Sequence, residues 1–196
     1  AVPRSVTDMR EAITFLGTDT VATLVLASHV FTRMPVPGVN LDALWKHSLT
    51  VSAMAQQIAA QEGGDRLTVN TVGVAGLLHD IGDGLAPQNH DRFSAEVIRP
   101  FVREEVAWVV EHHGIFQMVY YANHYGWDEN ARERFRDHPC FDSCAEFCER
   151  WDQASFDPEY DSLPLEHFEP MVRQVFARKA YAPDVIREGF VSALSA

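Results

Sequence analysis

The segment of residues 67–82, LTVNTVGVAGLLHDIG, is the strongest constraint that this sequence places on its fold. Its apolar residues predict a helix, and His79 and Asp80 lie near the C-terminal end of that helix. Consecutive side chains do not share one face of a helix. Imidazole and carboxylate are nevertheless both metal-binding groups. The segment therefore predicts a helix that brings two different donors to one metal site.

The rest of the chain also shows helical spacing of apolar residues, interrupted by glycine and proline. Helices are predicted for residues 5–16, 19–33, 41–61, 92–98, 103–114, 130–136, 140–153 and 171–180. Residues 116–126 are compatible with a helix or with extended chain, and the prolines within residues 156–170 predict a loop. Strand signals are nearly absent, so the predicted fold class is all-α.

The length of 196 residues and the apolar content of 46% predict one globular domain, residues 1–196, with a sizeable core. No apolar run approaches the ~18 residues of a membrane helix, and the N-terminus has no signal-peptide pattern. We therefore expect a cytoplasmic protein without membrane contact. The net charge of −12 repels a phosphate backbone and argues against a nucleic-acid partner. The oligomeric state stays open.

Three cysteines, Cys140, Cys144 and Cys148, follow one another at intervals of four residues. This spacing puts them along one stripe of a helix, where they are poorly placed to pair with one another. We therefore expect small buried thiols in a reducing compartment.

Six residues with metal-binding chemistry are distributed over the predicted helices. They are His47, His79, Asp80, His90, His113 and Asp152. Apart from the adjacent pair, each lies within or at the edge of a different predicted helix, which is how helical bundles build metal sites. Imidazole and carboxylate without thiolate suit iron, manganese or another first-row metal. Because a carboxylate has two oxygens, Asp80 can bridge two metals while His79 binds one. The set predicts a dinuclear centre with open positions for water, oxygen or substrate.

An ordered set of motifs resembles the HD-domain superfamily of metal-dependent proteins. The motifs are HS at His47, LLHDIGD at residues 77–83, HHG at residues 112–114 and WD at residues 151–152. The resemblance covers the chain from Leu41 onward and implies an HD-domain helical bundle around a dinuclear metal centre. It divides the single domain into N-terminal helices at 1–40, a metal-binding core at 41–180 and a C-terminal tail at 181–196.

Residues 1–82 resemble an HDOD module. The matching text is REAITFLGTDTVATLVLASHVF, LWKHSLTVSAMAQQIA and VAGLLHDIG. HDOD modules are usually bacterial signalling or regulatory domains, often without demonstrated catalysis. This resemblance therefore implies a regulatory role.

Residues 76–180 resemble instead the organophosphonate-oxygenase branch of HD proteins. The matching text is LLHDIGD, NHDRFSAEVIRPFV, WVVEHHGIFQ and residues 137–176. Members of that branch hold a mixed-valent pair of irons, Fe2+ and Fe3+, that activates O2. The six residues match its ligand positions in order, and His113 is preferred to His112 because the ligand directly precedes the glycine-like position. The two resemblances meet near residues 82–91.

Three positions around the expected substrate depart from that branch. Asp83, Gln117 and Glu149 stand where the branch has basic or hydrogen-bonding side chains. They are candidate substrate-binding residues, and the alternative for each is a solvated side chain at a helix end. An anionic phosphonate beside Asp83 and Glu149 would meet repulsion instead of bidentate arginine recognition. For His112 two interpretations stay open, a hydrogen-bond donor behind the metal ligands or an exposed side chain.

The candidate ligands and the two resemblances are compatible with three alternative functions. The first is an O2-dependent diiron oxygenase, with Fe2+ and Fe3+ as cofactors, that acts on a small polar hydroxylated substrate. The second is an HD-type phosphohydrolase, in which Mn2+ or another divalent metal supplies a bound hydroxide. The third is a non-catalytic HDOD signalling module.

Overall fold

The computed structural model describes residues 41–61, 63–83, 85–156 and 163–185. Within these ranges every regular element is a helix, so the predicted all-α fold class is confirmed. The helices predicted for residues 5–16 and 19–33 lie outside the described residues, as does most of the tail predicted at 181–196.

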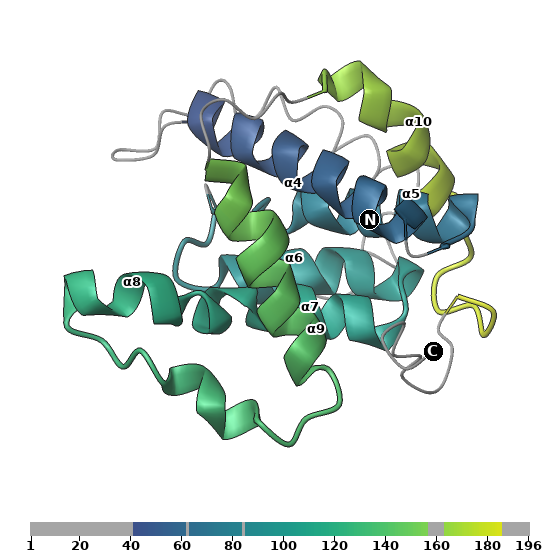
Figure 1. Cartoon of the computed structure of the whole chain (residues 1–196). Coiled ribbons are helices and arrows are strands. Elements are labelled where there is room, and N and C mark those ends of the chain that lie inside the picture. The colour runs from purple at the N-terminus through teal and green to yellow at the C-terminus, as the bar shows by residue number, and fades with distance from the viewer. Residues whose placement is uncertain (1–40, 62, 84, 157–162, 186–196) are drawn as a thin grey trace, which may run out of the picture.

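Two neighbouring helices, α4 (Leu41–Gln61) and α5 (Arg66–Leu78), form the upper layer of the fold (Figure 1). Asp65 caps α5 by accepting a hydrogen bond from the Thr68 amide at 2.7 Å. The Ser52 hydroxyl of α4 donates to the Gly73 carbonyl of α5, and this buried bond links the two helices. The helix predicted through residue 82 ends earlier, so the His-Asp pair lies in the turns directly after α5.

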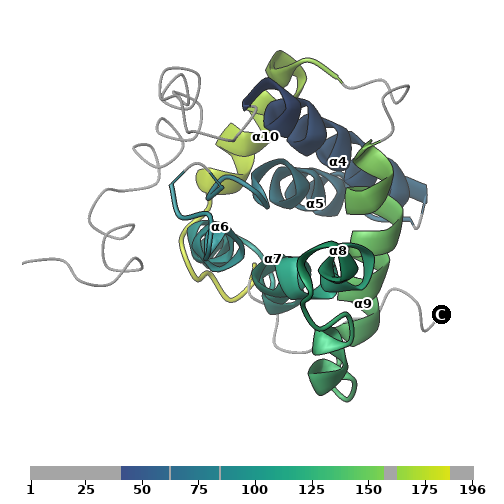
Figure 2. The same cartoon turned by 90° about the vertical axis from the view of Figure 1, so that its left-hand side faces the viewer.

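A second layer lies below these helices and contains α6 (His90–Ile98) and α7 (Glu104–Phe116) (Figure 2). A 3-10 turn, Arg99–Phe101, connects them. The buried Arg99 forms ion pairs with Glu96 of α6 and with Glu104 and Glu111 of α7. Residues 116–126, which were compatible with two conformations, form the helix α8 (Met118–Tyr125).

One long helical segment runs across the other helices and changes its winding along the way (Figure 2). It follows the 3-10 turn Ala131–Phe135 and begins as α9 (Phe141–Glu146). It continues as a π-helical turn, Phe147–Asp152, and ends as a 3-10 turn, Gln153–Phe156. The helix predicted at residues 140–153 is therefore confirmed. The π turn was not predicted, and such wide turns are frequent at functional sites.

The loop predicted at residues 156–170 is wrong at its C-terminal end, because α10 (Leu165–Phe176) includes Pro170. The missing amide of Pro170 leaves the Glu166 carbonyl without its helical partner. Both residues are exposed, so water can satisfy that carbonyl. The apolar face of α10 packs on α5 and contributes Phe168, Met171, Val172, Val175 and Phe176 to the core. Burial of that face outweighs the local preference of proline.

The three cysteines are free and buried, as their spacing predicted. They lie along the α9 segment in an apolar cluster with Phe116 and Phe141. Burial raises the pKa of the Cys140 thiol to about 12, and it raises the pKa of Cys148 well above its usual value. Such thiols are inert.

No helix within the described ranges combines the length and the apolar character that a membrane crossing requires.

Gly82 is needed where the chain leaves α5 and passes α6. A Cβ atom at Gly82 would lie 2.7 Å from the His90 Cα and 2.8 Å from the His90 carbonyl oxygen. Since that obstacle is backbone, we predict that Gly82→Ala lowers the free energy of unfolding by about 1–3 kcal/mol. Urea unfolding measures this change.

The matched control is Gly114→Ala. Its Cβ would meet the far end of the Asp91 side chain at 3.2 Å and would lie in ordinary contact with His90 Cε1 at 3.8 Å. That carboxylate can rotate away, and alanine in a helix is favoured over glycine by about 0.5–1 kcal/mol. An equal loss of stability in the two variants would contradict the close approach at Gly82.

Candidate metal centre

The six predicted ligands converge from five segments of the fold. His47 lies on α4, His79 and Asp80 directly follow α5, and His90 begins α6. His113 lies on α7, and Asp152 ends the π turn. Subsets of these six have donor atoms close enough to hold a metal ion together.

One group of donor atoms consists of His47 Nε2, His79 Nε2, Asp80 Oδ2 and Asp152 Oδ1. His47 Nε2 lies 3.2 Å from His79 Nε2, 3.3 Å from Asp80 Oδ2 and 3.1 Å from Asp152 Oδ1. His79 Nε2 lies 3.1 Å from Asp80 Oδ2 and 3.8 Å from Asp152 Oδ1. Donors that each lie about 2.1 Å from one metal are about 3.0–3.4 Å apart. Four of these five distances fall in that range, and the fifth, between His79 and Asp152, is wider. The group therefore has close to the spacing of a coordination sphere.

A second group lies on the other side of the Asp80 carboxylate. Asp80 Oδ1 is 3.1 Å from His113 Nε2 and 3.6 Å from His90 Nε2, and the two imidazole nitrogens are 3.3 Å apart. Each Asp80 oxygen thus faces a different pair of histidines. This is the arrangement that a bridging carboxylate requires.

The partners of the Nδ1 atoms determine which nitrogen of each ring can bind a metal. The His79 Nδ1–H donates to the Gly76 carbonyl at 2.6 Å, and the His113 Nδ1–H donates to the Val110 carbonyl at 2.7 Å. A carbonyl can only accept, so Nδ1 carries the proton and Nε2 of a neutral ring carries the lone pair. Metal-binding histidines are typically held in this way.

The Nδ1 atom of His47 faces the Ser155 hydroxyl. That hydroxyl donates to the Asp152 carbonyl at 2.7 Å, so it accepts from His47. The Nδ1 atom of His90 lies 3.2 Å from the Pro87 carbonyl and 3.2 Å from Asp83 Oδ1. All four rings therefore direct Nε2 toward the other candidate ligands. We call these six residues, His47, His79, Asp80, His90, His113 and Asp152, the cluster.

Without a cation this arrangement is unfavourable. When the rings are neutral, His47 Nε2 and His79 Nε2 present lone pairs to each other at 3.2 Å. Asp152 Oδ1 is buried and has no hydrogen-bond partner among the described residues. Unpaired buried carboxylate oxygens are costly. Protons or metal ions relieve both problems, so the donor set fits a metal.

The pKa shifts in the metal-free cluster share one cause, the close contacts between histidines and carboxylates. Burial by itself lowers the pKa of His79, but the Asp80 and Asp152 carboxylates outweigh it and raise that pKa well above its usual value. The pKa values of His47 and His113 are raised in the same way. Burial would raise the pKa of Asp80, but the histidines hold it well below its usual value, and Asp152 is lowered likewise.

The candidate substrate-binding residues fall into two groups. Asp83 and Gln117 contact the cluster directly, because Asp83 faces His90 and Gln117 donates to Asp152 Oδ2. Glu149 is exposed on the π turn. Burial, and after it the Glu149 carboxylate, raises the pKa of Tyr120. The structure thus brings two of the three to the cluster.

His112 points into an aromatic stack. Its ring stacks on Trp108 with 4.0 Å between ring centroids, and its Nδ1 faces the Trp108 carbonyl at 2.8 Å. Its neighbour His113 is the residue that meets Asp80. The role of His113 as a metal ligand stays a prediction.

Sequence reasoning missed three residues that surround the ligands. Ser155 orients His47, and Phe156 stacks on the His47 ring with 4.5 Å between centroids. Phe147 lies edge-on to His79, with 5.6 Å between centroids. Ser155 follows Asp152 by three residues, and only the spacing along the helical turn could have indicated it.

The family model described as HDOD domain matches residues 1–106 of the chain. The chain belongs to the HDOD domain family. The match continues past the junction predicted at residues 82–91 and includes four of the six cluster residues, all except His113 and Asp152. No curated protein matches the chain.

Ser155 offers a test of the orientation of His47. We predict that Ser155→Ala lowers metal affinity about 10- to 100-fold, because His47 loses its Nδ1 partner. Titration of the chelator-treated protein with Mn2+ by calorimetry measures the change. Ser143→Ala is the matched control, since that hydroxyl donates to Glu105 away from the cluster. Equal affinities of the two variants would contradict the role of Ser155.

The raised histidine pKa values predict that the stability of the metal-free fold falls as the pH rises. The stabilisation that bound metal adds should grow over the same range. Protonated histidines stabilise the metal-free fold fully below about pH 6.5, and this contribution is lost as the pH rises through their raised folded-state values. The lowered pKa of Asp80 also contributes stability to the fold. This contribution is present above about pH 4 and is lost as the pH falls through the folded-state pKa of that carboxyl. Metal binding needs neutral rings and releases those protons.

We therefore expect the melting temperature in EDTA to fall from pH 6.5 to pH 9, while the increase produced by saturating Mn2+ grows. Thermal unfolding at both metal conditions measures this difference. A metal-induced shift that stays constant across the range would contradict the assigned cluster.

Proposed function

We propose that the chain binds two metal ions between its helices, with Asp80 as the bridging ligand. The observation that carries this proposal is the division of the Asp80 oxygens, Oδ2 toward His47 and His79 and Oδ1 toward His90 and His113. A site for one metal would not need two histidine pairs on opposite sides of one carboxylate. The metal-binding core at residues 41–180 would then form part of a single domain.

We further propose that the metals are a pair of iron ions, Fe2+ and Fe3+, and that the reaction is O2-dependent oxidation of a small polar hydroxylated substrate. The nitrogen and oxygen donors support iron or manganese over a structural zinc site. When bound, such a pair supplies Lewis acidity toward a substrate oxygen and electrons for the reduction of O2. The group with His90 and His113 has fewer protein donors than the group with Asp152, which leaves more room for exogenous ligands on that side.

The surroundings of the cluster support an uncharged substrate. The contacts of the ligands described above include Asp83, Gln117, Ser155, Phe147 and Phe156. None of these side chains is cationic, and an anionic phosphonate or phosphate would usually need arginine or lysine for recognition.

Asp83 is the residue that we propose to receive the substrate. Burial and the nearby Asp80 raise its pKa, while His90 holds the carboxylate in place. Asp83 is 31% exposed and His90 is 23% exposed, so this edge of the cluster is the most accessible from solvent. A carboxylate there can accept a hydrogen bond from a substrate hydroxyl.

Two other functions remain as outcomes of the test. A bridging carboxylate also suits two-metal hydrolysis of phosphate esters. Membership of the HDOD family supports a regulatory module that binds a ligand or partner without turnover.

The deciding experiment combines metal content, spectroscopy and turnover. We expect the protein purified anaerobically with iron to contain two irons per chain and, after partial oxidation, to give the EPR signal of a coupled Fe2+/Fe3+ pair. Oxygen consumption with a panel of polyols and amino alcohols would then identify the substrate class. Mn2+-dependent, O2-independent release of phosphate would establish the hydrolase instead, and substoichiometric metal would establish the regulatory module.

Asp80→Asn tests the bridge itself. The amide keeps the shape but lacks the second anionic oxygen, so we predict that metal content falls to one ion or fewer per chain and that the coupled signal disappears. Asp142→Asn, an exposed change in the first turn of α9, is the matched control. Retention of two coupled irons in Asp80→Asn would contradict the bridging assignment.

A further inference from the structure

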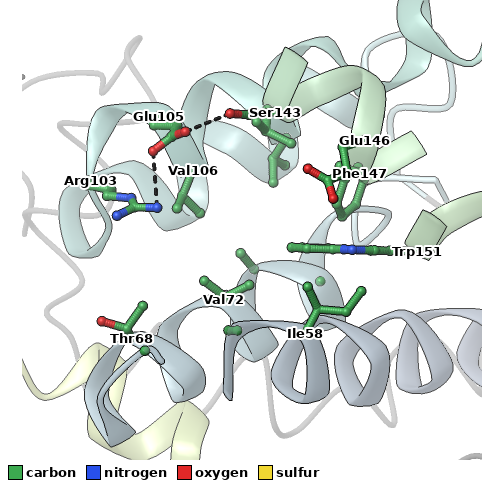
Figure 3. Close-up of a pocket in the computed structure, with 16 residues that line it drawn as sticks. Ile58, Thr68, Val72, Arg103, Glu105, Val106, Ser143, Glu146, Phe147 and Trp151 are labelled. Carbon is green, nitrogen blue, oxygen red and sulfur yellow. Dashed lines mark hydrogen bonds and ion pairs between the residues drawn. The ribbon is translucent and has the colours of Figure 1, made fainter. Parts of the chain in front are cut away.

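A cavity of about 540 Å³ is bordered by the first half of α5, the start of α7 and the residues that follow α10. Its apolar wall includes Val72 and Val106. Figure 3 shows part of this wall, with Thr68 and Val72 on one side and Arg103 and Val106 on the other. An apolar wall with a few polar groups is typical of sites that bind small molecules.

This cavity is separate from the metal centre. None of the six cluster residues lines it. It lies beside the N-terminal half of α5, whereas His79 and Asp80 follow the C-terminal end of that helix. A ligand in this cavity would therefore occupy a second site.

The residues after α10 are held against the 3-10 turn that precedes α7. The Tyr181 amide donates to the Pro100 carbonyl at 2.7 Å. Arg178 Nη1 donates to the Phe101 carbonyl at 3.1 Å, and Arg178 Nη2 donates to the Thr71 hydroxyl of α5 at 2.6 Å. The Arg178 guanidinium, which lines the cavity, is therefore held in one position in its wall.

The positive charge of Arg178 is only partly balanced. Its two hydrogen bonds go to neutral oxygens, and no carboxylate in the part of the chain that the structure describes forms an ion pair with it. Burial lowers the pKa of Arg178, and the carboxylates of Asp184 and Asp65 offset this lowering only in part. A half-buried cation is costly unless an opposite charge compensates it. The wall therefore favours an anionic ligand.

Arg178 and its neighbour Lys179 can supply the donors for such a ligand. A guanidinium has five N–H groups, and the two hydrogen bonds of Arg178 use one on each Nη atom, so each Nη retains a second N–H. Lys179 also lines the cavity and is exposed, and its ammonium group makes no contact with the other described residues. Arg103 does not add to this charge, because it is paired with Glu105.

The two acidic residues in the lining limit the charge of the ligand. Asp65 and Asp184 both border the cavity. Their carboxylates repel a second negative charge on a ligand. The wall therefore favours the single charge of a carboxylate over the double charge of a phosphate monoester.

We propose that this cavity binds a small organic acid with an apolar body and one carboxylate, and that Arg178 and Lys179 hold the carboxylate. The apolar body lies against Val72 and Val106. The carboxylate compensates a cation that the fold leaves without an ion pair. This site does not depend on the identity of the metal or on the reaction at the metal centre.

Two probes of nearly the same shape test the proposal. 2-Naphthoate carries a carboxylate where 2-naphthamide carries a neutral amide. We expect 2-naphthoate to bind the full-length, chelator-treated protein about tenfold more tightly, because its hydrogen bonds are assisted by charge. Calorimetric titration at pH 7 measures both affinities. Saturation with Mn2+ should leave them unchanged, and binding of 2-naphthoate that requires Mn2+ would overturn the proposal, because the probe would then lie at the metal centre.

Arg178→Gln locates the carboxylate. Glutamine lacks the charge but keeps an N–H group for the Phe101 carbonyl. We expect this variant to bind 2-naphthoate about tenfold more weakly, as the loss of a charged partner predicts, and to bind 2-naphthamide as before. Arg173→Gln is the matched control, since this exposed arginine of α10 pairs with Glu169 and does not line the cavity.

Lys179→Glu is a second variant that does not disturb the wall, because Lys179 is exposed. The reversed charge should weaken 2-naphthoate about fivefold and leave 2-naphthamide unchanged, with Arg173→Glu as its control. Circular dichroism shows whether each variant is folded, and Lys179→Glu decides the question if Arg178→Gln is not. Equal affinity of the two probes for the unaltered protein, absence of 2-naphthoate binding, or equal 2-naphthoate binding by a folded cavity variant and its control would overturn the proposal.

Discussion

The rest of the site depends on the contacts of the Asp80 carboxylate with four imidazole rings. Its two oxygens face different pairs of histidines, at distances between 3.1 and 3.6 Å. Three helices and the turn after α5 must keep their relative positions for these contacts to exist. The packing of α4 on α5 and of α6 on α7 therefore has a direct consequence for chemistry, since a shift of about 1 Å would remove the spacing of a coordination sphere.

The fold holds this polar group between two apolar clusters. Leu77 and Leu78 of α5 belong to one cluster, and Val51 and Phe147 belong to the other. Low polarity around the site strengthens the attraction between carboxylates and cations, and it also makes unpaired charges costly.

The sequence was sufficient for most of the helices and for choosing six side chains that the structure brings together, because both depend on local features. Helical spacing follows from burial of one face, and the donors are recognisable by residue type and order. The sequence was not sufficient for α10, where burial of Phe168 and Val172 overrides Pro170. The π turn and the contact of Ser155 with His47 depend on how distant segments meet, and the three-residue spacing from Asp152 is the one local hint of Ser155. Metal binding by the six donors stays a prediction.

The extent of the HDOD match bears on where the function resides. The matched residues, 1–106, supply His47, His79, Asp80 and His90. With these alone, Asp80 Oδ1 would face one histidine, and the group around His47 would lack Asp152. His113 and Asp152 come from the part of the chain beyond the match, and they complete one group each. A two-metal centre therefore requires both parts of the chain, and any activity at that centre belongs to the assembled fold of residues 41–156 and not to the family-matched part by itself.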